Sequence, residues 1–587
     1  MCGILGQVVL SGQIQEDIFR KMLLSLSHRG PDHTGLKISE NNRIALGHTR
    51  LSFLDLSEQG AQPMCDNNGE VWLTFNGEIY NYLELKKELS HSYSFQTETD
   101  SEVIIAAYKV WGIAFINKLK GMFAFGLYDS NIQKIFLVRD RFGIKPLYYY
   151  NSGAQLIFAS ELKAIMASGE VAKNINYSAF SDYFVYRYIP SPKTIWQNVN
   201  KIEPATYLEI NTLSFEQKHI EYWKLHANNS LSDPILIEEI NEIIKNAVKE
   251  HTRSDVPIGS FLSGGYDSSA LVHYMKTLGQ NPETFSIGFS NWEKSEDQFA
   301  ELVAKHLSVN NTKVVADENS LQYLEIMPTV YDEPIADISI IPTFMVSKLA
   351  KTKVKAVLSG EGADEIFGGY TWQQDFMKKP NSTWFRSLFG EKIDTVSWYA
   401  EAMAMGKFDA KELKLMLHPR LHPHIEKDVF WFYRQHFLPK LSRLKSIQYL
   451  DIKCFMGELV LTKMDRASMA NSLEVRVPFL DHTLFEKIFS LQESNYFKPE
   501  QTKFLLYENI KNILPKQILN RKKQGFVGPD KYYMNIDFYK KELENSALVK
   551  YEIINQAYIN ELLTETYNWK LWKIVVMEKW FKHWIDH

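Results

Sequence analysis

The chain has 587 residues, more than one compact core usually holds, so its length favours two large domains. Hydrophobic residues make up 45% and charged residues 23%, as in ordinary globular proteins, and the net charge of −4 does not favour nucleic acid as a partner. Three scattered cysteines, the lack of an apolar run of about 18 residues and the lack of a signal-peptide layout predict a cytoplasmic protein that is not bound to a membrane.

The first third of the chain alternates strand-like and helical segments irregularly. Apolar, β-rich runs occur at 43–54, 71–76, 123–128, 134–139, 146–150 and 155–159, and helical periodicity occurs near 16–26, 82–89 and 101–110. Clusters of strands separated by a few helices are typical of an α+β layer domain rather than of βαβ units.

A cysteine stands at position two. Trimming of Met1 would leave Cys2 with a free α-amino group, and an amine that titrates near about pH 8 can act as a base for the adjacent thiol. Considered alone, Cys2 would rather be interpreted as a small buried residue of a first strand.

Four further segments follow Cys2 in order, namely His28–Asp32, Gly47–Ser52, Phe75–Asn81 and Thr99–Glu102. Together with Cys2-Gly3-Ile4 they resemble the class II glutamine amidotransferase domain. The resemblance implies a domain over residues 2–210 with the four-layer αββα fold of N-terminal-nucleophile hydrolases.

The same resemblance assigns roles to individual residues. Cys2 would attack the carboxamide of glutamine, and the Asn76 side chain and the Gly77 N–H would stabilise the oxyanion that develops. Arg50 would clamp the α-carboxylate of glutamine, while Glu78 and Asp100 would hold its α-ammonium group. Taken singly, Arg50 could be a surface charge and Asn76-Gly77 a hairpin turn.

Polar residues dominate 211–234, and we place a linker there. After a helical segment at 236–251, strand-like runs at 256–262, 284–288, 312–315 and 354–358 alternate with helices. This alternation predicts an α/β domain with a doubly wound parallel sheet, whose ligands bind beyond the carboxyl ends of the strands.

The loop Ser263–Ser269 follows the first of these strands and precedes a helix. Gly264 and Gly265 allow backbone N–H groups to approach an anion closely, and Ser268 and Ser269 add hydroxyl donors at the start of the helix. Asp267 would repel phosphate unless Mg²⁺ lay between the two. The loop lacks the Walker lysine and resembles the pyrophosphate loop of enzymes that cleave ATP between its α and β phosphates. A serine–glycine turn without function is the alternative.

An acidic turn, Leu358–Glu365, follows the fourth strand. Asp364 could share Mg²⁺ with Asp267, and Glu361 could accept a proton from an incoming amine. An exposed acidic loop is the alternative interpretation.

Four later segments complete the pattern, namely Lys463–Arg466, Leu473–Asp481, Gln501–Leu506 and Arg521–Phe526. With the two loops they resemble the asparagine synthetase domain, which would span residues 235–530 and be followed by a helical extension at 531–587. The tryptophans of that extension indicate a packing stripe rather than a membrane anchor.

The resemblance implies that this domain uses ATP and Mg²⁺. Lys503 matches the position of a cation on the pyrophosphate, and the implied nucleotide contacts are Leu262, Ser263, Gly264, Gly265, Asp267, Ser268, Ser269, Ile287, Ser359 and Gly360. The planar fork of Arg476 suits a substrate carboxylate, although Arg476 could instead pair with a nearby acid.

We therefore expect an enzyme of the glutamine-hydrolysing asparagine synthetase family, with aspartate as the expected acceptor and a homodimer as a possible assembly. Two alternatives stay open at this point. One is an amidotransferase that acts on another carboxylate, such as a uronic-acid sugar of a surface polysaccharide. The other is a catalytically silent, metabolite-sensing relative. A β-lactam synthetase is disfavoured because those relatives lack a working cysteine at this position.

Overall fold

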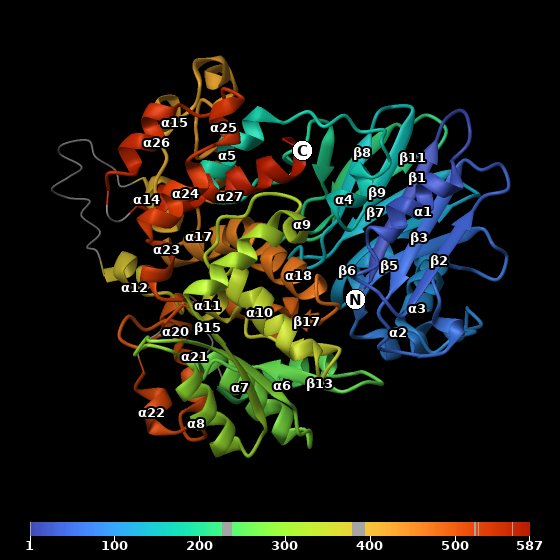
Figure 1. The fold of residues 1–587 in the computed structure, drawn as a ribbon. Helices are drawn as coiled ribbons and strands as arrows, with labels where there is room; N and C mark the ends of the chain where they lie inside the picture. Colours follow the sequence, from blue (N-terminus) through green and yellow to red (C-terminus); the bar gives the residue numbers. More distant parts are fainter. Residues whose placement is uncertain are drawn as a thin grey trace.

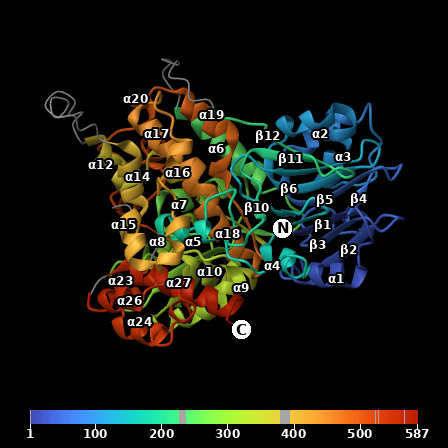
Figure 2. The same ribbon diagram turned by 90° about the horizontal axis from the view of Figure 1, so that it is seen from above.

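The computed structural model of the chain describes residues 2–225, 237–378, 394–521, 524–525, 528–565 and 568–586. The strand-rich N-terminal part lies beside a larger, helix-rich part that contains the rest of the chain (Figure 1). The view from above separates the same two parts (Figure 2).

The N-terminal domain contains two six-stranded antiparallel sheets, with the strand orders β10-β8-β9-β1-β3-β2 and β12-β11-β7-β6-β5-β4. The strands of the first sheet are β1 (Gly3–Val9), β2 (His33–Ile38), β3 (Ile44–Arg50), β8 (Tyr148–Asn151), β9 (Gln155–Ala159) and β10 (Val199–Lys201). Those of the second sheet are β4 (Met64–Cys65), β5 (Val71–Ile79), β6 (Gly121–Asp129), β7 (Lys134–Arg139), β11 (Thr206–Asn211) and β12 (Gln217–Glu221).

The two sheets and their helices form four layers. Apolar side chains of both sheets, among them Ile4, Leu137 and Phe158, form one buried cluster. Helices α1 (Glu16–Leu24) and α4 (Leu162–Met166) pack on the first sheet, whereas α3 (Asp100–Trp111) packs on the second with α2 (Tyr82–Leu89) beside it. This arrangement confirms the predicted αββα fold.

The strands and helices predicted in this domain coincide with observed ones, but β1 and the edge strands β2, β4, β10 and β12 were missed. β12 lies within the predicted linker at 211–234 and pairs with β11 along Gln217–Glu221. Its residues are mostly polar and exposed, so they lack the apolar alternation that reveals a strand. Residues 226–234 of the predicted linker lie outside the described residues.

The second domain is built on a five-stranded, wholly parallel sheet with the order β15-β14-β13-β16-β17. Its strands are β13 (Ile258–Phe261), β14 (Thr284–Phe289), β15 (Asn311–Ala316), β16 (Ala356–Leu358) and β17 (Glu474–Arg476). The helices α6 (Ile237–His251), α7 (Tyr266–Thr277), α8 (Asp297–Leu307) and α10 (Ile340–Lys351) accompany these strands. The sheet confirms the predicted α/β class.

The strand order reverses between β13 and β16. From β13 the chain proceeds outward to β14 and β15, and then returns to the other side of β13 for β16 and β17. In open α/β sheets this switch point is where the loops after two neighbouring strands separate and leave a ligand crevice. The loops in question are the two glycine-bearing segments singled out in the sequence.

The remaining described α-helices are α5 (Tyr177–Tyr186), α9 (Met327–Tyr331), α11 (Ala363–Phe367), α12 (Thr371–Lys378), α14 (Thr395–Met403), α15 (Ala410–Met416), α16 (Trp431–His436), α17 (Arg443–Leu450), α18 (Leu461–Met469), α19 (His482–Ser490), α20 (Glu493–Tyr496), α21 (Phe504–Ile510), α22 (Lys516–Leu519), α23 (Asp530–Tyr533), α24 (Ile536–Leu543), α25 (Ala547–Lys550), α26 (Gln556–Leu562) and α27 (Trp569–Trp584).

Helix α27 packs against the interior of the molecule. Trp572 and Trp580 are fully buried, and the ring of Trp580 lies 5.3 Å from that of Trp196 in the N-terminal third. The Tyr183 hydroxyl donates a hydrogen bond of 2.8 Å to the Lys573 carbonyl. The tryptophan stripe therefore packs within the protein, as the sequence indicated. Over the described residues, we find no helix with both the length and the apolar character to cross a membrane.

Candidate functional site

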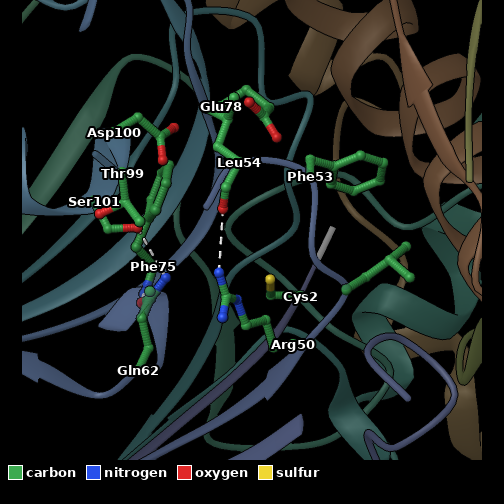
Figure 3. Close-up of a pocket in the computed structure, with 13 residues that line it drawn as sticks. Cys2, Arg50, Phe53, Leu54, Gln62, Phe75, Glu78, Thr99, Asp100 and Ser101 are labelled. Carbon is green, nitrogen blue, oxygen red and sulfur yellow. Dashed lines mark hydrogen bonds between the residues drawn. The ribbon is translucent and has the colours of Figure 1, made fainter. Parts of the chain in front are cut away.

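A pocket of about 390 Å³ lies where β1, β3 and β5 come together at one end of the N-terminal domain. Its lining comes from separate strands and loops whose side chains surround a common space (Figure 3). The lining residues are Cys2, Arg50, Leu51, Phe53, Leu54, Gly60, Gln62, Phe75, Gly77, Glu78, Thr99, Asp100 and Ser101. Five of the six residues predicted to handle glutamine are in this set, and the sixth, Asn76, contacts Cys2.

Cys2 directly precedes β1, and its side chain is buried in the pocket. Its backbone N–H donates a 3.0 Å hydrogen bond to Oδ1 of Asn76. The Nδ2 of Asn76 is buried and has no hydrogen-bond partner among the described residues, so it remains able to donate. Burial raises the pKa of the Cys2 thiol above its usual value, although a hydrogen bond from the Leu51 backbone opposes the shift. A thiol of this kind needs a base before it can attack.

Gly77 occupies a position that other residues could not take. Its φ is +158°, and a Cβ there would lie 2.1 Å from the Met122 carbonyl oxygen on β6. β5 and β6 can therefore pair at this point only if the residue has no side chain. This close pairing fixes the backbone between Asn76 and Glu78.

Arg50 ends β3, and its guanidinium group lies in the pocket wall. Nη1 donates to the Ser57 carbonyl at 2.9 Å, and Nη2 donates to the carbonyls of Leu54 and Asp55 at 3.2 and 2.6 Å. The loop that these carbonyls belong to is thereby held over the pocket. Arg50 has the predicted location, with several of its N–H groups directed to this loop.

Asp100 begins α3 and accepts a 2.9 Å hydrogen bond from the Ile79 N–H. Burial raises the pKa of Asp100 to about 6, even though that hydrogen bond favours the ionised form. Glu78 lies on β5 next to Ile79, and its Oε1 is 3.0 Å from Nη2 of Arg476 in the second domain. Burial raises the pKa of Glu78, and the guanidinium of Arg476 opposes this shift.

Gln62 and Ser101 are among the lining residues that were not predicted. Gln62 donates through Nε2 to Ser101 Oγ at 3.1 Å and accepts from the Phe75 N–H at 2.7 Å, so it links the loop to β5. Ser101 belongs to the segment Thr99–Glu102 and could have been suspected from its neighbour Asp100. Gln62 lies outside the four segments that resemble the amidotransferase domain.

A second pocket, of about 490 Å³, opens at the switch point of the parallel sheet. Its lining residues are Ser263, Gly264, Gly265, Tyr266, Asp267, Glu296, Thr502, Lys503, Ile518, Arg521 and Gln524. The predicted pyrophosphate loop thus forms one wall. The hydroxyl of Ser268 accepts a 3.1 Å hydrogen bond from the Ser263 N–H and so closes the loop on itself. Gly264 has a φ of +72°, and a Cβ there would lie 2.5 Å from the Phe299 backbone.

Lys503 joins the two aspartates that were predicted to bind metal. Its Nζ forms an ion pair with Oδ2 of Asp267 and lies 2.8 Å from Oδ1 of Asp364. Lys503 is buried, and it immediately precedes α21. Residues that are more than 230 positions apart in the chain are thereby brought to one point.

The acidic turn packs directly against the pyrophosphate loop. A Cβ at Gly360 would lie 2.7 Å from Cβ of Asp267, so glycine is required for this contact. Among the described residues, the lining of the second pocket does not include the predicted contacts Leu262, Ser268, Ser269, Ile287, Ser359, Gly360, Glu361 and Asp364. They belong to the two loops and the strands beside this wall. The nucleotide contacts of the first six, the role of Glu361 as proton acceptor and that of Asp364 as metal ligand remain predictions.

The acceptor role predicted for Arg476 does not fit the structure. Arg476 is fully buried, its Nε pairs with Glu474 at 2.5 Å, and its Nη1 donates to the carbonyls of His251 and Arg253 at 2.9 and 2.7 Å. Nη2 faces Glu78 of the first pocket. The guanidinium is therefore directed toward the N-terminal domain, and the alternative of a structural pair with nearby acids describes it better.

Arg521 has a role that the sequence left ambiguous. It pairs through Nη2 with Glu296 at 2.5 Å, and both side chains line the second pocket. The guanidinium also lies 4.2 Å from the ring of Phe299. Arg521 stood in a quoted segment, but a partner 225 positions earlier could not be inferred from spacing.

The donors beside the second pocket suit a hard cation shared with a ligand. No group of three or more histidine, cysteine, aspartate or glutamate side chains placed to hold a metal occurs among the described residues. Asp267 and Asp364 supply two carboxylates near the glycine loop, and Mg²⁺ in phosphate sites is held by one or two carboxylates together with phosphate oxygens. This donor set therefore fits Mg²⁺ only in company with a bound polyphosphate.

The chain is similar to known proteins over nearly its whole length. A family model described as a glutamine amidotransferase domain matches residues 1–223, and one described as asparagine synthase matches residues 239–582. Glutamine-hydrolysing asparagine synthetase 1 of Bacillus subtilis (strain 168) is 33% identical over 99% of this chain and 96% of its own length. A putative asparagine synthetase of Methanocaldococcus jannaschii is 38% identical over 65% of this chain and 78% of its own. Amidase chry2 of Gibberella zeae is 28% identical over 96% and 94%.

Proposed function

The chain belongs to the glutamine-hydrolysing asparagine synthetase family, and from this membership we propose that it converts aspartate to asparagine with the amide nitrogen of glutamine. It is a glutamine-hydrolysing ligase that consumes ATP. The identity of the acceptor, the use of Mg²⁺ and the residue roles below are parts of the proposal. The observation that supports it most strongly is that Lys503 forms ion pairs with Asp267 and Asp364 at the switch point of the parallel sheet.

In the first pocket, Sγ of Cys2 attacks the carboxamide carbon of glutamine, while the α-amino group that trimming of Met1 would free takes the thiol proton and passes it to the departing nitrogen. The side-chain Nδ2 of Asn76 and the N–H of Gly77 stabilise the oxyanion of the tetrahedral intermediate. Collapse of that intermediate expels ammonia and leaves a thioester on Cys2, which water then hydrolyses to glutamate and the free thiol. Arg50, Glu78 and Asp100 hold the α-carboxylate and α-ammonium groups while this occurs.

In the second pocket, the β-carboxylate of aspartate attacks the α-phosphorus of ATP and displaces pyrophosphate. Lys503 neutralises charge on the leaving pyrophosphate, whose oxygens the backbone of Gly264 and Gly265 approaches. Asp267 and Asp364 would hold Mg²⁺, which would supply further charge neutralisation when bound. Ammonia from the first pocket then displaces AMP from the acyl-AMP, and Glu361 takes up the proton that the nitrogen loses.

A second candidate acceptor is another carboxylate, including a uronic-acid sugar. Its support is that a relative of nearly full-length similarity, amidase chry2, has a different activity in its name. The phosphate machinery would be the same in both cases. A catalytically silent relative is disfavoured by the intact sets of residues in both pockets.

An assay of pyrophosphate release distinguishes these candidates. ATP, Mg²⁺ and glutamine are supplied with aspartate, glutamate or a panel of uronic-acid sugars, and the amide product is identified by mass. We expect turnover with aspartate and the formation of asparagine. The variant Cys2→Ala should lose synthesis from glutamine and keep synthesis from ammonium salts. Turnover with a uronic acid and none with aspartate would show that the acceptor is a uronic acid. The absence of pyrophosphate release with every carboxylate would overturn the proposal.

A further inference from the structure

The first pocket is closed in part by the second domain. Glu78 lies in the pocket lining, and its carboxylate is 3.0 Å from the guanidinium of Arg476, which ends β17 of the parallel sheet. A residue nearly 400 positions away thus touches a residue proposed to bind the substrate amine.

Arg476 is held rigidly at this place. Its Nε and Nη1 are bound by Glu474, His251 and Arg253, all of the second domain, at 2.5 to 2.9 Å. The guanidinium also lies 5.3 Å from the ring of Phe53, another pocket residue. Because these contacts hold the planar guanidinium in place, the position of Nη2 is fixed as well. The guanidinium therefore determines the position of the Glu78 carboxylate.

The charge on Glu78 also depends on this contact. Glu78 is buried, and the carboxylates of Glu474 and Asp100 are its neighbours. Burial and these two acids favour its protonated form, whereas Arg476 is the guanidinium that favours the charged form. A carboxyl group must be ionised to hold an ammonium group well.

We propose that Arg476 is a positioning residue of the glutamine pocket, supplied by the second domain, that orients the Glu78 carboxylate toward the α-ammonium group of glutamine. This inference rests on the proposed function of the first pocket. It replaces the acceptor role that the sequence suggested for Arg476.

The contact also links the two pockets through one residue. The carbonyl of Arg476 accepts a 2.8 Å hydrogen bond from the N–H of Ser359, which begins the turn that packs on Asp267. The side chain of Arg476 therefore serves the glutamine pocket while its backbone supports the loop of the ATP-type site. Glutamine bound at Glu78 would lie next to the side chain of Arg476, and a nucleotide bound at the switch point would lie next to the loop that the Arg476 backbone supports.

The test measures glutamate release from glutamine by the full chain. In Arg476→Met we expect the KM for glutamine to rise about 10- to 100-fold, because the buried Glu78 carboxylate loses the cation 3.0 Å away that orients it, while kcat changes about threefold or less. Arg476→Lys, which retains the charge without the fork, should recover part of the loss. Because Arg476→Met leaves Glu474 without its partner, Glu474→Gln/Arg476→Met serves as a second variant that avoids a buried lone charge.

Two comparisons separate positioning from a general loss of structure. Lys355→Met removes an ion pair of 2.7 Å with Asp32 that also crosses the domain boundary, and it should leave the KM for glutamine unchanged. In a Glu78→Gln background, Arg476→Met should add nothing further to the KM, because its effect passes through Glu78.

An unchanged KM in the Arg476 variants, or an equal further loss in the Glu78→Gln background, would overturn the inference. If the wild-type protein released glutamate normally in those experiments, the proposed function of the first pocket would still stand. A wild-type protein unable to hydrolyse glutamine would overturn both.

Discussion

Asp100 is the carboxylate that we propose binds the α-ammonium group of glutamine. It is buried, with a pKa raised to about 6, and it lies at the N-terminal end of α3, where it accepts the Ile79 N–H. A raised pKa means that the neutral carboxyl form persists up to about pH 6. Only above this value is its negative charge present for the substrate ammonium group.

We therefore predict that kcat/KM for glutamine hydrolysis rises with pH through an apparent pKa near 6. Below that value the protonated carboxyl loses its attraction for the ammonium group, and the rate constant should fall about tenfold per pH unit. The measurement is glutamate release between about pH 5 and pH 7. Asp100→Asn should be slower throughout and should lack this limb. The limb persisting unchanged in Asp100→Asn would show that another group titrates there.

At the scale of elements, the loops after β13 and β16 and the start of α21 converge at the switch point of the sheet. Each is short, and each is anchored by a buried strand or helix, so the ion pairs of Lys503 form without long flexible segments. The sheet thereby fixes three charges whose chain positions are 267, 364 and 503.

Lys503→Met should reduce pyrophosphate release about 100-fold or more, because it removes a cation from the site of the leaving group. Glutamine hydrolysis should be little affected, since the first pocket has no contact with Lys503. Lys511→Met, which removes an exposed i,i+3 pair with Glu508 at the other end of the same helix, is the matched control and should retain activity. Equal losses in both variants would point to damage of α21 rather than to a role for the charge.

The elements that the sequence revealed are those with regular apolar patterns. The long strands of both sheets, apart from β1, were found at nearly their observed limits, and so were α1, α2 and α3. β17 was missed because three residues, Glu474–Arg476, are too few to show a period, and two of the three are charged. The pairs Arg476–Glu78 and Arg521–Glu296 were missed because partners separated by hundreds of residues leave no trace in spacing. Five of the six residues predicted to bind or cleave glutamine line the first pocket, whereas Gln62, which lies in none of the quoted segments, was not predicted.

At the scale of the whole molecule, buried ion pairs cross the boundary between the two domains. Arg29 is fully buried, and its guanidinium binds Glu161 at 2.7 Å and Asp465 of α18 at 2.9 Å. Its Nε also donates to the Cys2 carbonyl at 3.0 Å. The two domains are thus joined next to the nucleophile predicted for the first pocket.

Arg29→Met should lower the stability of the protein by about 3–5 kcal/mol, because it leaves Asp465 buried without its cation. Arg434→Met removes two exposed ion pairs, one of 2.7 Å with Asp394 and one with Asp428, and it should cost no more than about 1 kcal/mol. Thermal unfolding of the two variants and the wild type measures the difference. Similar midpoints for the two variants would mean that the buried network contributes no more than a surface pair.

Helix α27 has a consequence for the way the protein is synthesised. Its residues 569–584 leave the ribosome after every other described helix and strand, yet Trp580 covers Trp196 and donates to the Asp332 carbonyl at 2.6 Å. During translation, the indole ring of Trp196 therefore stays uncovered by α27 until several hundred further residues have been synthesised. A product terminated before residue 569 would keep that surface exposed, which would make it a natural target for chaperones and proteases.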